Sequence, residues 1–219
     1  MTRLYVYALT GTPVAPFSDG GQTVESLEID GVYVVAIRAH EKAATTEKAL
    51  RRQHALVERL VEAADAVLPA KFGSLVDDEE LRCVIGARRG SIAEALGLVM
   101  GRRQMTVRFI QRGGVAEPQA ALPDATGTAY LHRRRGAARG TVPAADLAAF
   151  QEAVRDLIAG ERVTAGTGDV LSTVFHLVDR MRIEEYRSRA TAAGEHLAGT
   201  SILVTGPWPA FAFVPELLP

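Results

Sequence analysis

The sequence has 219 residues, of which 47% are hydrophobic and 23% charged, and its formal net charge is −1. This apolar share supports packed cores and excludes an intrinsically disordered chain. The balanced charge provides no global field that would attract nucleic acid or an anionic membrane. The N-terminus lacks the apolar core of a signal peptide, and no apolar run approaches the roughly 20 residues that span a bilayer. We therefore expect a soluble cytoplasmic protein.

The N-terminal half begins with a predicted small sheet. Alternation over residues 3–9 predicts a strand, and the glycine- and proline-rich residues 11–21 predict a loop. Two further strands, 24–29 and 32–37, are expected to form a hairpin, because Asp30-Gly31 between them favours a type I′ turn.

A long helix is expected over residues 46–65, with Thr45 as its N-cap. Its predicted inward stripe has apolar residues and one histidine three or four positions apart. These are Leu50, His54, Val57, Val61 and Ala64. The segment 67–74 that follows is expected to be extended and interrupted by Pro69.

Two capping boxes predict two further helix starts in this half. They are Asp77-x-x-Glu80 and Ser91-x-x-Glu94. Three glycines are expected to mark helix ends: Gly86, Gly90 and Gly101.

The C-terminal half shows a regular alternation of strands and helices. The expected elements are a strand at 105–110, a loop at 113–127, a helix at 128–135, a helix beginning at Pro143 with Leu147, Phe150, Val154, Leu157 and Ile158 inward, strands at 161–167 and 171–178, a helix capped by Asp179, and a strand at 200–205. The β-α-β-β-α-β order of this half is typical of a ferredoxin-like unit. We predict an α+β protein of two small domains: residues 1–103, a β-sheet with packed helices, and residues 104–219, ferredoxin-like with a Gly-Pro-Trp-Pro tail.

The residues that could carry chemistry form no convincing catalytic or metal-binding pattern. None of the five histidines stands at the His-x-x-x-His spacing of a helical zinc site, and Cys83 is the only cysteine. Gly-rich phosphate-binding motifs are absent. We expect no metal, no cofactor and no enzymatic activity.

Two histidines and the cysteine nevertheless need an interpretation. His54 is either a partly buried residue bonded to a neighbour such as Glu58, or a proton-transfer or partner-contact residue. His176 is expected in the core, on the strand face of Val174 and Val178. Cys83 is expected to be a small buried hydrophobe.

A basic cluster at Arg133, Arg134 and Arg135 favours a solvated face or a docking patch for acidic groups. The cluster lacks the interleaved aromatic residues that would stack on bases, so nucleic-acid binding is disfavoured.

The C-terminal stretch holds the only tryptophan between two prolines. Because proline fixes its own backbone and restricts the preceding residue, Pro207-Trp208-Pro209 presents the indole on a stiff segment. Such a segment either anchors on the body of the protein or contacts a partner, and both interpretations stay open for Trp208 and for Phe72. Gly73 is expected to serve a backbone need, such as a positive φ or close approach.

Several blocks occur in a fixed order along the chain. They are Leu4-Tyr5-Val6-Tyr7-Ala8-Leu9, the helix histidine His54, Val67-Leu68-Pro69-Ala70-Lys71-Phe72-Gly73-Ser74 with the acidic residues 77–80, Gly127-Thr128-Ala129-Tyr130-Leu131 before the arginines, Val178-Asp179-Arg180, and Gly206-Pro207-Trp208-Pro209-Ala210-Phe211. Together they resemble the GvpF/GvpL family of gas vesicle proteins over most of the chain. Lys71 replaces the family's usual arginine, and Ala210-Phe211 replaces a Pro-Tyr pair, which affects local contacts.

The resemblance implies a non-enzymatic accessory protein of gas vesicle assembly. It would bind the hydrophobic shell protein (GvpA type) and other gas vesicle accessory proteins, and help nucleate or build the vesicle. No nucleic acid and no membrane insertion are implied. The candidate contact or family-motif residues are His54, Pro69, Lys71, Phe72, Gly73, Tyr130, Arg133, Arg134, Gly206, Pro207, Trp208, Pro209 and Phe211.

Two other functions stay open. One is a small-molecule-binding sensor with tandem ferredoxin-like domains. The other is an enzyme with a site around His54 and the Lys71-Phe72 segment, which lacks a complete set of catalytic partners.

Overall fold

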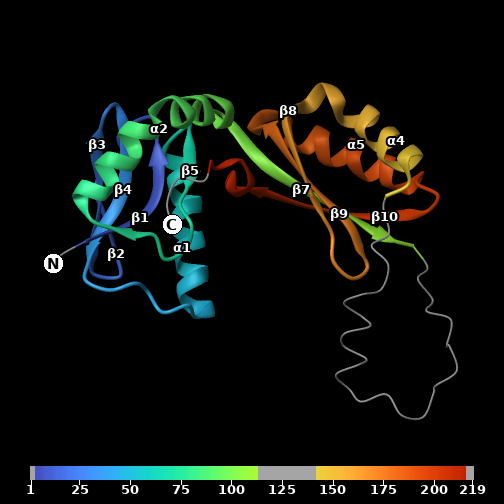
Figure 1. Ribbon diagram of the computed structural model, residues 1–219. Helices are drawn as coiled ribbons and strands as arrows, with labels where there is room; N and C mark the ends of the chain where they lie inside the picture. Colours follow the sequence, from blue (N-terminus) through green and yellow to red (C-terminus); the bar gives the residue numbers. More distant parts are fainter. Residues whose placement is uncertain (1–2, 113–141, 216–219) are drawn as a thin grey trace, which may run out of the picture. The chain divides into compact units, whose positions relative to one another are not determined.

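The computed structural model describes residues 3–112 and 142–215. The chain forms two compact units: Met1–Gln104 together with Trp208–Pro219, and Met105–Pro207. The described residues hold two antiparallel sheets and four α-helices, a mixed α/β architecture (Figure 1). The tail from Trp208 onward belongs to the first unit, whereas the sequence pattern placed it in the second domain. The reason is long-range packing of the tail, described below.

The sheet of the first unit has six strands. They are β1 (Arg3–Thr10), β2 (Phe17–Asp19), β3 (Gln22–Ile29), β4 (Val32–Ala39), β5 (Val67–Pro69) and β6 (Leu75–Val76). Their order is β2-β3-β4-β1-β5, and β6 also pairs with β1. Every residue of β1 from Leu4 to Thr10 is buried, so both faces of this central strand are covered.

The predicted hairpin is confirmed, and the predicted loop before it is partly wrong. Asp30 and Gly31 take φ values of 51° and 80°, as a type I′ turn requires. Within residues 11–21, β2 pairs with the start of β3, from Phe17↔Val24 to Asp19↔Gln22. The loop prediction missed this strand because its three residues are too short to show a period.

Helix α1 (Glu47–Ala63) confirms the long helix but corrects its cap and its buried face. Thr46, not Thr45, is the N-cap, and its hydroxyl accepts a hydrogen bond from the Ala49 N–H. The buried residues are Gln53, Leu56, Val57 and Leu60. Val57 of the predicted stripe lies on this face, and Ala64 is buried at the helix end. The rest of the face is displaced, because Leu56 and Leu60 pack into the core beneath the sheet and Leu50 is left 44% exposed.

Helix α2 (Asp78–Val99) begins where the first capping box predicts it. The Asp77 carboxylate accepts a 2.7 Å hydrogen bond from the Glu80 N–H. A break does occur close to the second predicted start, because Arg88 has non-helical φ and ψ of −117° and 15° and kinks α2 into two helical stretches. The Ser91 hydroxyl bonds the Arg88 carbonyl at 2.9 Å instead of capping a new helix.

Glycines and the cysteine of α2 also differ from expectation. Gly86 and Gly90 lie inside α2, whereas Gly101 follows it with φ 67° and marks the helix end as predicted. Cys83 is exposed rather than buried, because the buried side of α2 is formed by its larger aliphatic residues, such as Leu81 and Ile85.

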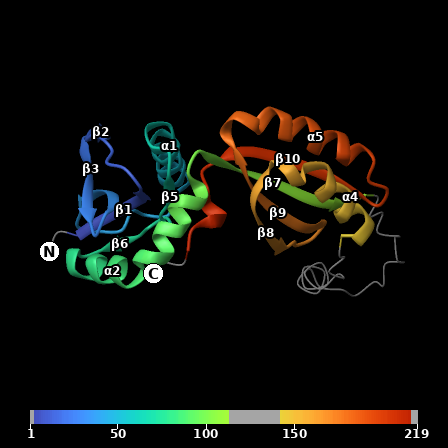
Figure 2. The same ribbon diagram turned by 90° about the horizontal axis from the view of Figure 1, so that it is seen from above.

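The second unit contains a four-stranded sheet and two helices. Its elements are β7 (Arg102–Gln111), α4 (Ala144–Val154), β8 (Ile158–Ala165), β9 (Val170–Asp179), α5 (Ile183–Glu195) and β10 (Thr200–Trp208). The sheet order is β10-β7-β9-β8. Figures 1 and 2 both draw α4 and α5 against this sheet, and the core between them contains Phe109, Phe150 and Tyr186. The β-α-β-β-α-β order among the described elements agrees with the sequence pattern.

Element boundaries in this unit shift by a few residues. Pro143 is the residue before α4 rather than its first residue. Strand β8 begins at Ile158, which pairs with Val178, and not at Glu161. Asp179 caps a short 3-10 turn, Arg180–Arg182, by accepting from the Met181 N–H, and α5 starts after that turn. The loop and helix predicted for residues 113–135 lie outside the described residues.

Candidate functional site

Three aromatic rings of the first unit gather on α1. The His54 imidazole stacks on Phe211, with ring centroids 6.0 Å apart and planes at 22°, and lies 5.7 Å from Trp208. All three are partly exposed. The His54 side chain is 41% exposed, and the residues Trp208 and Phe211 are 37% and 42% exposed. We call these three residues the aromatic cluster. It brings together a helix histidine and the Pro-Trp-Pro tail, which the sequence pattern marked as separate candidates.

Buried residues of the tail hold the cluster in place. Pro209 and Ala210 are buried beyond the end of β10, and so is Phe213 in the 3-10 turn Phe211–Phe213. The Ala212 N–H donates a 2.8 Å hydrogen bond to the Gln104 side chain. These anchors explain why the tail belongs to the first unit and leave Trp208 and Phe211 partly open to solvent.

Gly206 and Pro207 lie in β10 just before Trp208, which is the last residue of that strand. Gly206 has φ 119°, and its peptide bond to Pro207 is cis. The Arg187 guanidinium donates to the Gly206 carbonyl. Glycine suits this position because a residue with a side chain rarely adopts a positive φ.

Charged groups flank the aromatic cluster. Glu58 lies one helical turn from His54, with its carboxylate 3.6 Å from Nε2, as the sequence spacing suggested. The largely buried Arg103 pairs with the same carboxylate at 3.4 Å and also with Glu62. Arg103 therefore offsets the negative charge beside the rings.

The second family-motif segment runs from Pro69 to Gly73. Pro69 is buried in β5 opposite Ala8, whereas the Lys71 side chain is exposed. Gly73 has φ 84° with open space around its Cα, so the positive φ is what requires glycine here, as predicted. Its N–H donates to the Tyr5 hydroxyl at 3.0 Å, and Phe72 meets the Tyr5 ring edge-on.

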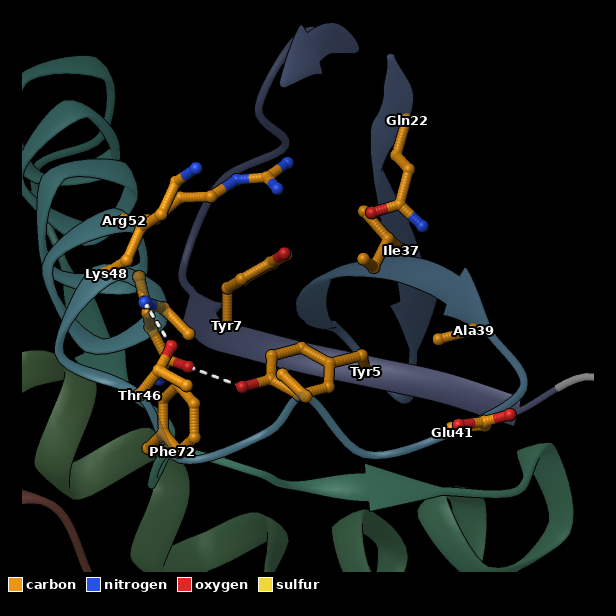
Figure 3. Close-up of a pocket in the computed structure, with 13 residues that line it drawn as sticks. Tyr5, Tyr7, Gln22, Ile37, Ala39, Glu41, Thr46, Lys48, Arg52 and Phe72 are labelled. Atoms are coloured by element: carbon orange, nitrogen blue, oxygen red, sulfur yellow. Dashed lines mark hydrogen bonds between the residues drawn. The ribbon is translucent and has the colours of Figure 1, made fainter. Parts of the chain in front are cut away.

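This segment borders a pocket of about 350 Å³ that the sequence pattern did not predict. Tyr5 and Tyr7 of β1 line it together with residues of β3, β4 and α1 and with Phe72 (Figure 3). The Tyr5 hydroxyl donates to the buried Gln53 side chain at 2.7 Å. The signal in the sequence was the i, i+2 spacing of two tyrosines, which places both rings on one face of a strand.

The pocket contains one phenol hydroxyl without a hydrogen bond to any described residue, that of Tyr7. Tyr7 is only 7% exposed, and its ring lies 5.2 Å from that of Tyr5. Burial raises the pKa of Tyr7 to about 12, although nearby Arg52 opposes the shift. Burial also raises the pKa of Tyr5, against the hydrogen bond from Gly73. Both phenols therefore carry their protons at neutral pH.

A buried polar network occupies the second unit. The His176 imidazole is fully buried. Its Nδ1 lies 2.7 Å from the Tyr186 hydroxyl oxygen, and its Nε2 lies 2.9 Å from a carboxylate oxygen of Glu161. Burial lowers the pKa of His176, and Glu161 opposes this. Because a carboxylate only accepts, Nε2 carries the hydrogen and Nδ1 accepts from Tyr186. His176 lies in the core, as predicted.

Other kinds of site are absent within residues 3–112 and 142–215. No group of three or more histidine, cysteine or acidic side chains is arranged to hold a metal ion there. No helix in those ranges combines the length and apolar character needed to cross a membrane. The candidate residues Tyr130, Arg133 and Arg134 lie outside the described residues.

The fold thus defines a mixed α/β protein of two compact units, with an aromatic cluster and a pocket on the first. The chain belongs to the family described as gas vesicle synthesis protein GvpL/GvpF, whose sequence profile matches residues 3–215. No curated protein matches the sequence.

Two crystal structures share this fold. The gas vesicle protein GvpF from Anabaena sp. PCC7120 is 15% identical, with a TM-score of 0.73 over 98% of this chain and 99% of that chain. The GvpF of Microcystis aeruginosa is 16% identical, with a TM-score of 0.72 over 96% and 98% of the two chains. At this identity the likeness establishes the architecture, and the family profile establishes membership.

Proposed function

We propose that this chain is a non-enzymatic accessory protein of gas vesicle assembly. It binds the hydrophobic shell protein and helps nucleate or build the vesicle, in the cytoplasm and at the growing vesicle. The observation that carries this proposal is the family match over residues 3–215, since its description names gas vesicle synthesis. A very apolar subunit needs a partner that shields it before assembly, because exposed apolar surface aggregates.

The aromatic cluster is our candidate for the shell-protein contact. Tryptophan is enriched in binding hot spots, and large aromatic side chains contribute much apolar area at little entropy cost. Leu50 lies one turn before His54 on α1 and is 44% exposed, which extends the apolar surface along the helix. Pro69, Gly73, Gly206, Pro207 and Pro209 would act by shaping the backbone beside these contacts.

The remaining candidates complete the proposal. Lys71 and the arginines Arg133 and Arg134 would meet acidic groups on the shell protein or on other accessory proteins. We also propose that the second unit, Met105–Pro207, is a ferredoxin-like domain, on the basis of the β-α-β-β-α-β order and the β10-β7-β9-β8 sheet.

A capture experiment with the shell protein tests the function and the contact separately. Tagged wild-type protein, Trp208→Ala, Phe211→Ala and the control Met181→Ala are each co-expressed with the shell protein. Met181 is 86% exposed in the second unit, so its variant matches the loss of an exposed apolar side chain outside the cluster. We expect capture by the wild type and by Met181→Ala, and strong loss in the two cluster variants.

Two outcomes would contradict the proposal at different levels. Failure of the wild-type protein to capture the shell protein or any other vesicle component would refute the assembly role. Equal capture by all four proteins would keep that role and reject the aromatic cluster as the contact. A melting curve of each variant shows that loss of capture is not loss of the folded state.

The small-molecule sensor is the second candidate, and the pocket between β1, β4 and α1 is the observation in its favour. A ligand that binds only the folded state raises its melting temperature. Two results together would favour the sensor. One is a metabolite that raises the melting temperature of this protein in a thermal screen, and the other is failure of the same protein to capture any vesicle protein.

A further inference from the structure

The unpartnered Tyr7 hydroxyl is the feature of the pocket that points to a ligand. Tyr7 is more than nine-tenths buried, and its hydroxyl end points away from β1 toward the space between Arg52 and Ile37 (Figure 3). The hydroxyl oxygen is not among the fully buried unpartnered atoms, so it is open to the pocket, where a carboxylate oxygen would accept a charge-assisted hydrogen bond from it in place of water. Because the phenol keeps its proton at neutral pH, it offers a donor to that acceptor.

Positive groups lie on the helix side of the same pocket. Lys48 lines it and forms no ion pair with a described residue. Arg52 also lines it, and its two hydrogen bonds to Asp19, at 2.7 and 2.9 Å, leave further guanidinium N–H groups available. Lys48 lies in the first turn of α1, where the helix dipole favours an anion, and Arg52 lies one turn further along.

The rest of the lining is apolar and aromatic. Phe72 and the Tyr5 ring form one side, and Ile37 and Ala39 of β4 form another. Figure 3 shows Glu41 at the far end of the pocket from Lys48 and Arg52. Glu41 is therefore separated from Lys48. The Asp19 carboxylate already pairs with Arg52 at 2.7 Å, so among the described residues Lys48 is the unpaired positive charge at this end of the pocket.

We infer that this pocket binds a carboxylate carried on an apolar body about the size of one or two side chains. The carboxylate accepts from Tyr7 and faces Lys48 and Arg52, while the apolar body lies against Phe72 and Ile37. The volume of about 350 Å³ suits such a group and lies at the small end of ligand pockets. The source is either a free aryl or alkyl carboxylic acid or the C-terminal residue of a peptide chain, which share this chemistry.

This inference is independent of the gas vesicle role. Its test uses small probes without the shell protein, so either proposal can fail while the other stands.

Methyl NMR of the full chain, observing Ile37, provides the test. The probes are 4-phenylbutyrate, the matched alcohol 4-phenylbutan-1-ol, and a short peptide ending in Leu-Phe as free acid or as amide. We expect the acids to shift the Ile37 methyl signals and the alcohol or the amide to bind about tenfold more weakly, because the neutral head loses its charged contacts. Binding of 4-phenylbutyrate alone identifies a free acid as the source, and binding of the peptide acid alone identifies a chain terminus.

Three variants test the residues assigned to the positive end. Tyr7→Phe removes only the hydroxyl, and Lys48→Gln removes the unpaired charge; each is expected to weaken acid binding by about three- to tenfold. Lys42→Gln is the matched control, since Lys42 is exposed nearby but does not line the pocket. The inference is overturned if no acid shifts Ile37, if alcohol and acid bind alike, or if Lys42→Gln weakens binding as much as Lys48→Gln.

Discussion

Two histidines in this protein make the same ring contact in opposite surroundings. His54 stacks on Phe211 with centroids 6.0 Å apart and planes at 22°, and His176 stacks on Phe150 at 6.2 Å and 11°. The His54 side chain is 41% exposed, whereas that of His176 is fully buried.

Burial decides what each imidazole must do. Because His176 is buried away from solvent, both of its ring nitrogens need protein partners, which are Tyr186 and Glu161. His54 keeps solvent on one side and faces the Glu58 carboxylate at 3.6 Å, beyond ordinary hydrogen-bond length. Stacking geometry alone therefore does not separate a core histidine from a surface one. Changes at these rings and their neighbours test this difference, beginning with the change that should destabilise the fold most.

Phe150→Ala should be the most damaging change. Phe150 is fully buried and packs on both Phe109 and His176, so its truncation leaves a cavity in the second unit. We expect a loss of about 3–5 kcal/mol in the free energy of unfolding. Urea denaturation followed by far-UV circular dichroism measures it. A loss no larger than that of Phe211→Ala would show that the two stacks are equivalent.

His176→Phe keeps a ring in the core but removes both hydrogen bonds. It leaves the fully buried Tyr186 hydroxyl without its imidazole partner, and we expect a loss of about 1–3 kcal/mol. The same urea titration provides the measurement. Unchanged stability would mean that the network contributes packing alone.

Trp208→Ala should cost on the order of 1 kcal/mol, because the side chain is 37% exposed and the tail keeps its anchors at Pro209 and Phe213. A fully buried tryptophan would cost about 3–5 kcal/mol instead. Far-UV circular dichroism in urea distinguishes the two values. The larger value would make Trp208 a structural anchor and weaken its candidacy as a contact residue.

The smallest expected effect is a pH dependence that comes from His176. Burial lowers its pKa in the folded state, so the unfolded chain binds the proton more readily once the pH falls below about 6.5. Stability therefore falls as the pH falls through this window. We expect a smaller drop in melting temperature from about pH 7 to about pH 5 for His176→Phe than for the wild type. An equal drop would assign the acid sensitivity to other groups.

Local sequence determined much of this protein. The Asp30-Gly31 turn, the Asp77 cap and the positive φ of Gly73 were predicted because each depends on a few neighbouring residues. The strand and helix order of the second unit followed from hydrophobic periodicity. The motifs and their order along the chain were enough to indicate the family, because they are a property of the sequence itself.

Tertiary structure alone decided the rest, because the deciding contacts join distant parts of the chain. The exposed position of His54 depends on how α1 packs on its sheet, and its neighbours Trp208 and Phe211 come from the tail. The pocket likewise requires Tyr7, Arg52 and Phe72 to meet from a strand, a helix and a loop. Periodicity shows that a helix has a buried face, but only the packed core fixes which residues occupy it.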